Sequence, residues 1–257
     1  MPGYGYGYGY GVKAPSGGGA PTPPLADLYS WIDIQNSTPF DSSGDDYVDF
    51  YTSAGGDYGG IWDHTDAGNS ANKWDGTTQN GLAISKIHKP TGGNAPYEQA
   101  ARSGPWTEAS FGLAFYQETG QNNPIYLTGD DTYWSNAFYK NQNRRCGVRL
   151  GGTFYDTSAV GSWEFDAWNI VIYRYRKTGS PSIQVYLNGA DITTTTHNNI
   201  NKDYYIRKVF VTEDSSGNDC RLGDACIYDA FISLDTVNDL GIFLSNKYGL
   251  GQTWELS

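Results

Sequence analysis

The sequence of 257 residues is poor in the side chains that build metal centres and disulfide frameworks. It contains three cysteines, three histidines and one methionine. An odd number of cysteines excludes a fully paired framework, and no cysteine or histidine spacing matches a zinc site. Cys220 and Cys226 are expected on one extended strand, about 20 Å apart at ~3.3 Å per residue, which is too far for a bridge. We therefore predict that these two residues and Cys146 are free, buried thiols.

Long hydrophobic runs and clusters of basic residues are also missing. No apolar stretch approaches the roughly 20 residues that span a bilayer. The N-terminus has neither the basic nor the apolar region of a signal peptide. Lysine and arginine number 17 against 28 aspartates and glutamates, so the formal charge is −11. Because a negative surface repels phosphate backbones, these features predict a protein made in the cytoplasm that binds neither nucleic acid nor membrane.

Recognisable catalytic motifs are absent as well. The sequence has no nucleophile elbow, no phosphate-binding loop and no zinc-protease helix motif. Its nearest approach to the paired carboxylates of a retaining glycosidase is Glu164-Phe-Asp166, but no second glutamate follows on the same segment. We interpret this segment as a solvated turn before a strand. The expectation is a protein that is not an enzyme and has no catalytic residues.

What the sequence does contain begins with a repetitive N-terminal segment. Glycine, proline and serine dominate as far as Pro24, and four tyrosines alternate with glycines: Tyr4, Tyr6, Tyr8 and Tyr10. This composition cannot form a packed core, because glycine loses the most backbone entropy and no aliphatic face offsets that loss. We interpret residues 1–24 as an extended arm whose tyrosines anchor it to another protein surface. Residues 25–257 are expected to form one domain.

The remaining composition is typical of β-strands joined by turns. Aromatic residues make up 15% of the chain, and Gly, Asn, Asp, Ser and Thr are abundant. The clearest alternation of side chains lies at residues 168–188 and ends in Asn188-Gly189, a type I′ hairpin signal. Further strands are predicted at residues 25–34, 47–51, 60–62, 82–87, 106–116, 124–128, 146–150, 204–212 and 221–232.

One helix is predicted near the C-terminus. Thr236 can cap its first turn. Val237, Leu240 and Leu244 then form an apolar stripe at helical spacing. Gly249 is expected to end the helix, because glycine readily adopts the left-handed conformation of a helix C-terminus.

Three of these segments together point to a fold. They are the strand, turn and strand that end at Asn188-Gly189, the apolar strand of residues 221–233, and the helix end of residues 244–250. In this pattern, residues 168–250 resemble the laminin-G-like, concanavalin A-type jelly-roll superfamily. The resemblance implies an all-β, antiparallel jelly-roll β-sandwich with one short C-terminal helix. It does not imply one function, because this fold hosts lectins, glycosidases, adhesion modules and structural spacers.

Exposed aromatic side chains are the candidates for binding a carbohydrate, since their rings stack on sugars. Tyr173, Tyr175 and Tyr186 are expected to share one sheet face, and Trp134 lies in an Asn-rich loop together with Tyr139. The first four are our candidate carbohydrate-binding residues. The alternative is that both faces of this sheet are buried, which would leave these tyrosines in a core.

Clusters of aspartates could supply oxygen ligands for a calcium ion. They gather within residues 41–49, 63–66, 130–131 and 214–219. Calcium takes six to eight oxygen ligands, often from loops that meet only in the folded protein. No complete calcium loop is present in the sequence, so we expect no cofactor and assign no metal ligands, and Ca²⁺ stays open as the alternative.

Two functional hypotheses follow from these features. The first is a structural component of a phage-like virion, either a capsid decoration or a fibre protein, made in the host cytoplasm and displayed on the virion surface. Its arm would attach to the major capsid protein or another virion protein, and we expect a homo-oligomer such as a trimer. The alternative is a carbohydrate-binding adhesin that recognises a host or environmental polysaccharide.

Overall fold

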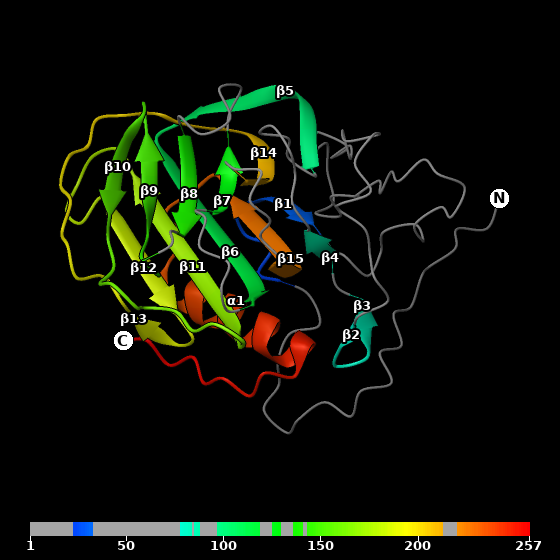
Figure 1. Ribbon diagram of the computed structural model, residues 1–257. Coiled ribbons are helices and arrows are strands. Elements are labelled where there is room, and N and C mark those ends of the chain that lie inside the picture. The colour runs from blue at the N-terminus through cyan, green and yellow to red at the C-terminus, as the bar shows by residue number, and fades with distance from the viewer. Residues whose placement is uncertain are drawn as a thin grey trace.

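The protein folds into two stacked antiparallel sheets with one helix on the outer face of one sheet (Figure 1). The computed structural model describes residues 23–32, 78–83, 85–87, 97–118, 125–129, 136–140, 143–212 and 220–257. This arrangement confirms the all-β sandwich with a single short C-terminal helix. The predicted strands at residues 47–51 and 60–62 lie outside the described residues.

The first sheet has seven strands and carries the helix. Its order is β1-β15-β6-β11-β12-β13, and β4 also pairs with β15. Long strands β6 and β11 pair over nine residue positions at its centre. The strands are β1 (Leu28–Ile32), β4 (Ser85–Ile87), β6 (Glu108–Gln117), β11 (Trp168–Arg176), β12 (Ile183–Leu187), β13 (Ala190–Asp191) and β15 (Cys220–Tyr228).

The second sheet has six strands in the order β10-β9-β8-β7-β14-β5. These are β5 (Tyr97–Trp106), β7 (Ile125–Gly129), β8 (Asn136–Lys140), β9 (Cys146–Leu150), β10 (Thr153–Asp156) and β14 (Tyr204–Thr212). A small separate hairpin is formed by β2 (Thr78–Gln79) and β3 (Leu82–Ala83). In Figure 1, β10, β9, β8 and β7 lie across β12, β11 and β6 of the other sheet.

Most of the strands predicted from alternation are present. The turn between β12 and β13 has positive φ at both Asn188 (50°) and Gly189 (84°), as a type I′ turn requires. Three strands of the six-stranded sheet, β5, β8 and β10, were not predicted. The predicted strand at residues 82–87 is in fact divided, since β3 pairs with β2 while β4 pairs with β15.

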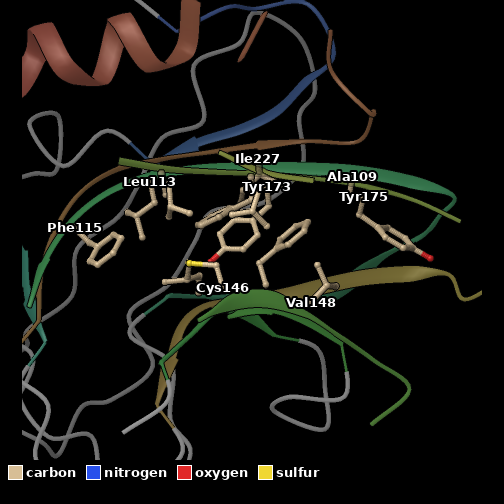
Figure 2. Close-up of a cluster of buried hydrophobic side chains, with 14 of the residues drawn as sticks. Ala109, Leu113, Phe115, Cys146, Val148, Tyr173, Tyr175 and Ile227 are labelled. Carbon is tan, nitrogen blue, oxygen red and sulfur yellow. The ribbon is translucent and has the colours of Figure 1, made fainter. Parts of the chain in front are cut away.

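The main core lies between the two sheets, and Figure 2 shows part of it, including Leu113, Phe115 and Tyr173. A second core lies on the opposite face of the seven-stranded sheet, beneath the helix. Along β11, Val171 and Tyr173 belong to the first core, whereas Ile170 and Ile172 belong to the second. Alternate side chains of this strand are therefore buried on both faces, which explains why the strand is almost continuously apolar.

Helix α1 (Leu234–Tyr248) closes the second core with the predicted apolar stripe of Val237, Leu240 and Leu244. Its N-cap is Ser233 and not Thr236, because the Ser233 hydroxyl accepts a hydrogen bond from the Thr236 amide at 3.1 Å. The helix ends at Gly249, in the left-handed conformation at φ 64°. No helix in the described part of the chain is long and apolar enough to cross a membrane.

A β-bulge in β15 contains the residue that connects the helix to the seven-stranded sheet. The register with β6 shifts between Leu222 and Ala225, which places Asp224 in a fully buried position. Its carboxylate accepts hydrogen bonds from Lys247 Nζ (2.6 Å), Tyr248 OH (2.6 Å) and Trp31 Nε1 (2.8 Å). One buried aspartate thus joins β1, β15 and α1.

The bulge also separates two of the cysteines. Cys220 belongs to the core between the sheets and Cys226 to the core beneath the helix, although both lie on β15 as predicted. All three cysteines are buried and free, which confirms the prediction.

Candidate functional site

The tyrosines predicted to bind a carbohydrate are buried, so that prediction is wrong for them. Exposure is 0% for Tyr173 and Tyr175 and 1% for Tyr186. Tyr173 and Tyr175 lie in the core between the sheets, as Figure 2 shows, and Tyr186 lies beneath the helix. They therefore do not share one face, and none of them can stack on a sugar ring.

Strand register is the physical reason for this correction. Tyr173 pairs with Val185 and Ile172 pairs with Tyr186, so Tyr173 lies on the same face as Val185 and opposite to Tyr186. The Tyr173 hydroxyl donates to the backbone oxygen of Tyr139 in the other sheet at 2.8 Å. Burial raises the pKa of Tyr173 well above its usual value. Tyr173 is therefore a structural residue that links the two sheets.

Other predicted positions lie outside the described residues. These are the arm tyrosines Tyr4, Tyr6, Tyr8 and Tyr10, the loop residue Trp134, and the aspartate clusters that left calcium open as an alternative. Within the described residues, no group of three or more His, Cys, Asp or Glu side chains is arranged to hold a metal ion.

The segment considered for glycosidase chemistry forms an exposed turn before β11, as predicted. Glu164 and Asp166 are both solvent-exposed, and Asp166 has a positive φ of 53°. The Asn169 side chain closes the turn by donating to the backbone oxygen of Glu164 at 2.9 Å. The two carboxylates do not lie on one strand face, which is the arrangement that a retaining glycosidase uses.

A different group of side chains forms the best candidate site. It lies on the outer face of the six-stranded sheet, over β8, β9 and β10. We call it the β9–β10 patch, and its members are Tyr139, Arg145, Arg149, Phe154 and Asp156. A tight turn at Gly151 and Gly152, with φ of 54° and 82°, joins β9 to β10 and determines which residues face each other.

The first row of the patch crosses the sheet from Tyr139 over Gly147 to Asp156, which are register partners. Gly147 leaves room for the tyrosine ring, because an added Cβ would lie only 2.7 Å from the Tyr139 hydroxyl. That hydroxyl donates to Asp156 Oδ1, and Arg145 Nη1 forms an ion pair with Asp156 Oδ2 at 2.9 Å. The carboxylate is therefore held in one orientation, although its side chain is 37% exposed.

The second row contains Arg149 and Phe154, which are also register partners. The Arg149 guanidinium lies over the Phe154 ring, 4.5 Å from its centroid. Tyr139 meets the same ring edge to face, with 5.3 Å between centroids and an interplanar angle of 89°. Even so, Phe154 remains 50% exposed. The patch thus presents a fixed aromatic ring beside an arginine–aspartate pair.

Sequence reasoning missed this site, apart from listing Tyr139 among loop aromatics. Tyr139 instead lies on β8 and is buried to 1% exposure. A usable signal was present. Gly151-Gly152 is flanked by two short runs of alternating residues, which is the pattern of a two-residue hairpin.

The described residues define the class of this chain as an antiparallel β-sandwich with one C-terminal helix. No family model matches the sequence, and no curated protein matches it. Among solved structures it is similar to a Trypanosoma rangeli sialidase, with a TM-score of 0.53 and 12% identity over 87% of this chain and 33% of the sialidase.

The chain is also similar to the binding domain of botulinum neurotoxin DC, solved in complex with SialylT. There the TM-score is 0.52 and the identity 10%, over 88% of this chain and 52% of that one. The same toxin domain in complex with rat synaptotagmin II gives a TM-score of 0.51 at 11% identity. The chain therefore spans about a third of the sialidase and about half of the toxin chains. Identities this low show the fold alone.

Proposed function

We propose that this chain is a lectin-like binding module whose β9–β10 patch binds a polysaccharide of a host or of the environment. The observation that carries the proposal is Phe154, an aromatic ring that is 50% exposed on a sheet face yet held by contacts on two sides. Large exposed apolar side chains that are fixed in place are typical of binding surfaces.

The stacking surface is preorganised for a sugar ring. Arg149 and Tyr139 restrict the Phe154 ring before any ligand arrives. A ligand that stacks on this ring loses little additional side-chain entropy, because the ordering has already been achieved by folding. A flat apolar ring of this kind matches the C–H face of a pyranose.

The polar half of the patch supplies hydrogen-bonding groups for hydroxyls. Arg145 and Asp156 are each 37% exposed, and their ion pair keeps a donor and an acceptor at fixed positions next to the aromatic row. Fixed polar groups around an apolar surface provide orientation and specificity in ligand sites. A neighbour of similar fold, the toxin binding domain, is complexed with SialylT, which supports a glycan ligand.

We propose that the protein binds a polysaccharide and does not hydrolyse it. Glu164 and Asp166, the carboxylates closest to a glycosidase motif in the sequence, are exposed turn residues with no shared strand face. A sialidase is among the neighbours, but this chain covers only 33% of it. We therefore expect the purified protein to bind polysaccharide and leave it intact.

Glycan-array screening followed by titration against the best hit tests the proposal. Phe154→Ala is expected to weaken binding at least about tenfold, equivalent to about 1.4 kcal/mol. Val160→Ala is the matched control, because Val160 is 60% exposed and lies outside the patch. Wild-type protein that binds no glycan, or a Phe154→Ala variant that binds as tightly as wild type, would contradict the proposal.

We propose display on a virion surface as a second role, on the basis of the glycine- and tyrosine-rich sequence of residues 1–24. The Tyr228 hydroxyl donates to the backbone oxygen of Pro24 at 3.1 Å. This hydrogen bond attaches residue 24 to β15, which lies between β1 and β6 in the seven-stranded sheet. Residues 1–22, which hold the four tyrosines of the arm, precede this attachment point in the sequence, and we propose that they bind a partner such as a capsid protein.

Density-gradient fractionation of the native source tests the virion role. The chain is expected to migrate with DNA-filled particles as a homo-oligomer such as a trimer. Deletion of residues 2–22 is expected to abolish attachment and leave the thermal stability of the domain unchanged, since Pro24 is kept. Migration as a small free species, or attachment without the arm, would contradict this role.

A further inference from the structure

A lysine amine and a glutamine amide meet in the interior of the sandwich. Lys140 on β8 is 0% exposed and Gln117 on β6 is 1% exposed. The Lys140 amine donates to Gln117 Oε1, although the two residues are 23 positions apart in the chain. They belong to different sheets, so this contact crosses the core.

The surroundings of Lys140 do not stabilise its charged form well. Its amine lies 4.4 Å from the centroid of Trp163 and 5.0 Å from that of Phe115. Within the described residues it makes no ion pair with a carboxylate, and the titratable groups acting on it are the thiols of Cys220 and Cys146. Burial consequently lowers the pKa of Lys140 from 10.5 to about 8. A sizeable neutral fraction near neutral pH makes this amine a nucleophile.

Gln117 supplies the matching electrophile. Its side-chain carbonyl is the acceptor for the same amine, so the Lys140 nitrogen is already held against the amide group. Cys220 is the direct cross-strand partner of Gln117, and Cys146 is the cross-strand partner of Lys140. Burial raises the pKa of Cys146 to about 11, so this thiol keeps its proton.

We propose that Lys140 and Gln117 react to form an intramolecular amide bond that joins the two sheets. The neutral Lys140 Nζ attacks Gln117 Cδ, forming a C–N bond. The bond from Cδ to the glutamine nitrogen then breaks. A proton lost by Nζ passes to that nitrogen, which leaves as ammonia. The reaction needs no oxidant and no cofactor, and water is excluded from the site because both side chains are buried.

The bond would give the domain a covalent link where it has no disulfide. All three cysteines are free, so the described sheets are held together by side-chain packing and hydrogen bonds alone. A link between β6 and β8 closes a chain segment and reduces the entropy of the unfolded state, as a disulfide does. A displayed binding module under mechanical load would gain resistance to separation of its sheets.

Intact-mass measurement of the purified full chain tests the proposal directly. Loss of ammonia predicts a mass about 17 Da below that of the sequence, because the amine replaces the amide nitrogen. Fragmentation after proteolysis is expected to identify one branched peptide that contains both Gln117 and Lys140. Wild-type protein with the full sequence mass would overturn the proposal, and so would a 17 Da loss located at another residue.

Variants at each of the two residues test whether Lys140 and Gln117 form the bond. Because either variant gives the answer, the test does not fail if one of them is unstable. Lys140→Met and Gln117→Met are each expected to restore the full mass. The matched control Lys202→Met, at an exposed lysine, is expected to keep the loss of about 17 Da. A Lys140→Met variant that still lacks this mass would overturn the assignment.

Discussion

Two buried lysines in this domain have opposite surroundings. Lys247 has a side chain that is 7% exposed, and it forms a 2.6 Å ion pair with the fully buried Asp224. Lys140 is 0% exposed and donates to a neutral amide, between two aromatic rings. The first lysine connects the helix to one sheet, and the second connects the two sheets.

The difference shows that a buried amine is either paired with a carboxylate or has a lowered pKa. A carboxylate partner with its own hydrogen bonds offsets the desolvation of Lys247, and the pair becomes part of the framework. Lys140 has no such partner among the described residues, so burial lowers its pKa to about 8 and a larger fraction of its amine is neutral than in an exposed lysine. The predictions below alter one lysine environment at a time, from the largest expected effect to the smallest.

Asp224→Asn is expected to have the largest effect. It removes the charge that pairs with Lys247 and disturbs the hydrogen bonds from Tyr248 and Trp31. Breaking a buried pair leaves an uncompensated charge, so the free energy of unfolding should fall by about 3–5 kcal/mol in urea titration. Asp239→Asn, at an exposed helix position, should change it by less than about 0.5 kcal/mol. Equal effects of the two substitutions would show that the Asp224 pair adds nothing.

Tyr248→Phe tests the hydrogen bonds around the paired lysine without removing a charge. It takes one donor from Asp224 Oδ1 and leaves the Asp224 amide, 2.8 Å from the hydroxyl, without its acceptor. The free energy of unfolding should fall by about 2 kcal/mol, as for hydrogen bonds to a charged group. Tyr116→Phe is the control, since Tyr116 contributes a ring contact to Trp168 and should lose less than about 0.5 kcal/mol. A similar loss in both variants would contradict this account.

The Gln117→Met variant cannot form the amide bond, so its Lys140 amine stays titratable. The lowered pKa of Lys140 should then make the free energy of unfolding of this variant depend on pH. The pKa of Lys140 is about 8 in the folded state against 10.5 in the ordinary state. Between these values the unfolded chain binds more protons, so the free energy of unfolding contributed by Lys140 rises with pH. The rise should be about 1.5 kcal/mol between roughly pH 8 and pH 9.5, and it should vanish below the folded pKa.

The control for this pH dependence is the double variant Gln117→Met with Lys140→Met. Other groups titrate in the same range; Cys146, with a pKa raised to about 11, acts with the opposite sign because the unfolded thiol loses its proton first. Cys146 and Lys140 also influence each other's pKa, so the difference between the two curves reports Lys140 together with its coupling to Cys146. Parallel curves would show that Lys140 has an ordinary pKa in the folded state.

Local patterns in the sequence predicted the elements whose signals are contained in a few neighbouring residues. The alternation along β11 and β12, the Asn188-Gly189 turn and the apolar stripe of α1 were all found where expected. The helix start was displaced by three residues, because Ser233 and Thr236 are both good capping residues and only the folded chain selects one. Strands β5, β8 and β10 were missed. β8 and β10 are only five and four residues long, and β5 contains Gly104 and Pro105, which are uncommon within strands.

The candidate site could not be predicted in the same way, because it depends on which strands become neighbours. Phe154 is exposed and Tyr173 is buried, although both are aromatic residues on strands. The difference arises from position, since β10 is an edge strand and β11 lies in the middle of its sheet. Register then decides the face, as it does for Tyr173 and Tyr186.

The sequence by itself determined the β-rich class, the C-terminal helix and the free thiols, because these follow from composition and from contacts between near neighbours. Tertiary structure alone decided that Asp224 meets Lys247, that Gln117 meets Lys140 and that Phe154 meets Arg149. These pairs depend on the bulge, the stacking of two sheets and the strand order, and such long-range geometry is set by the packing of the whole domain.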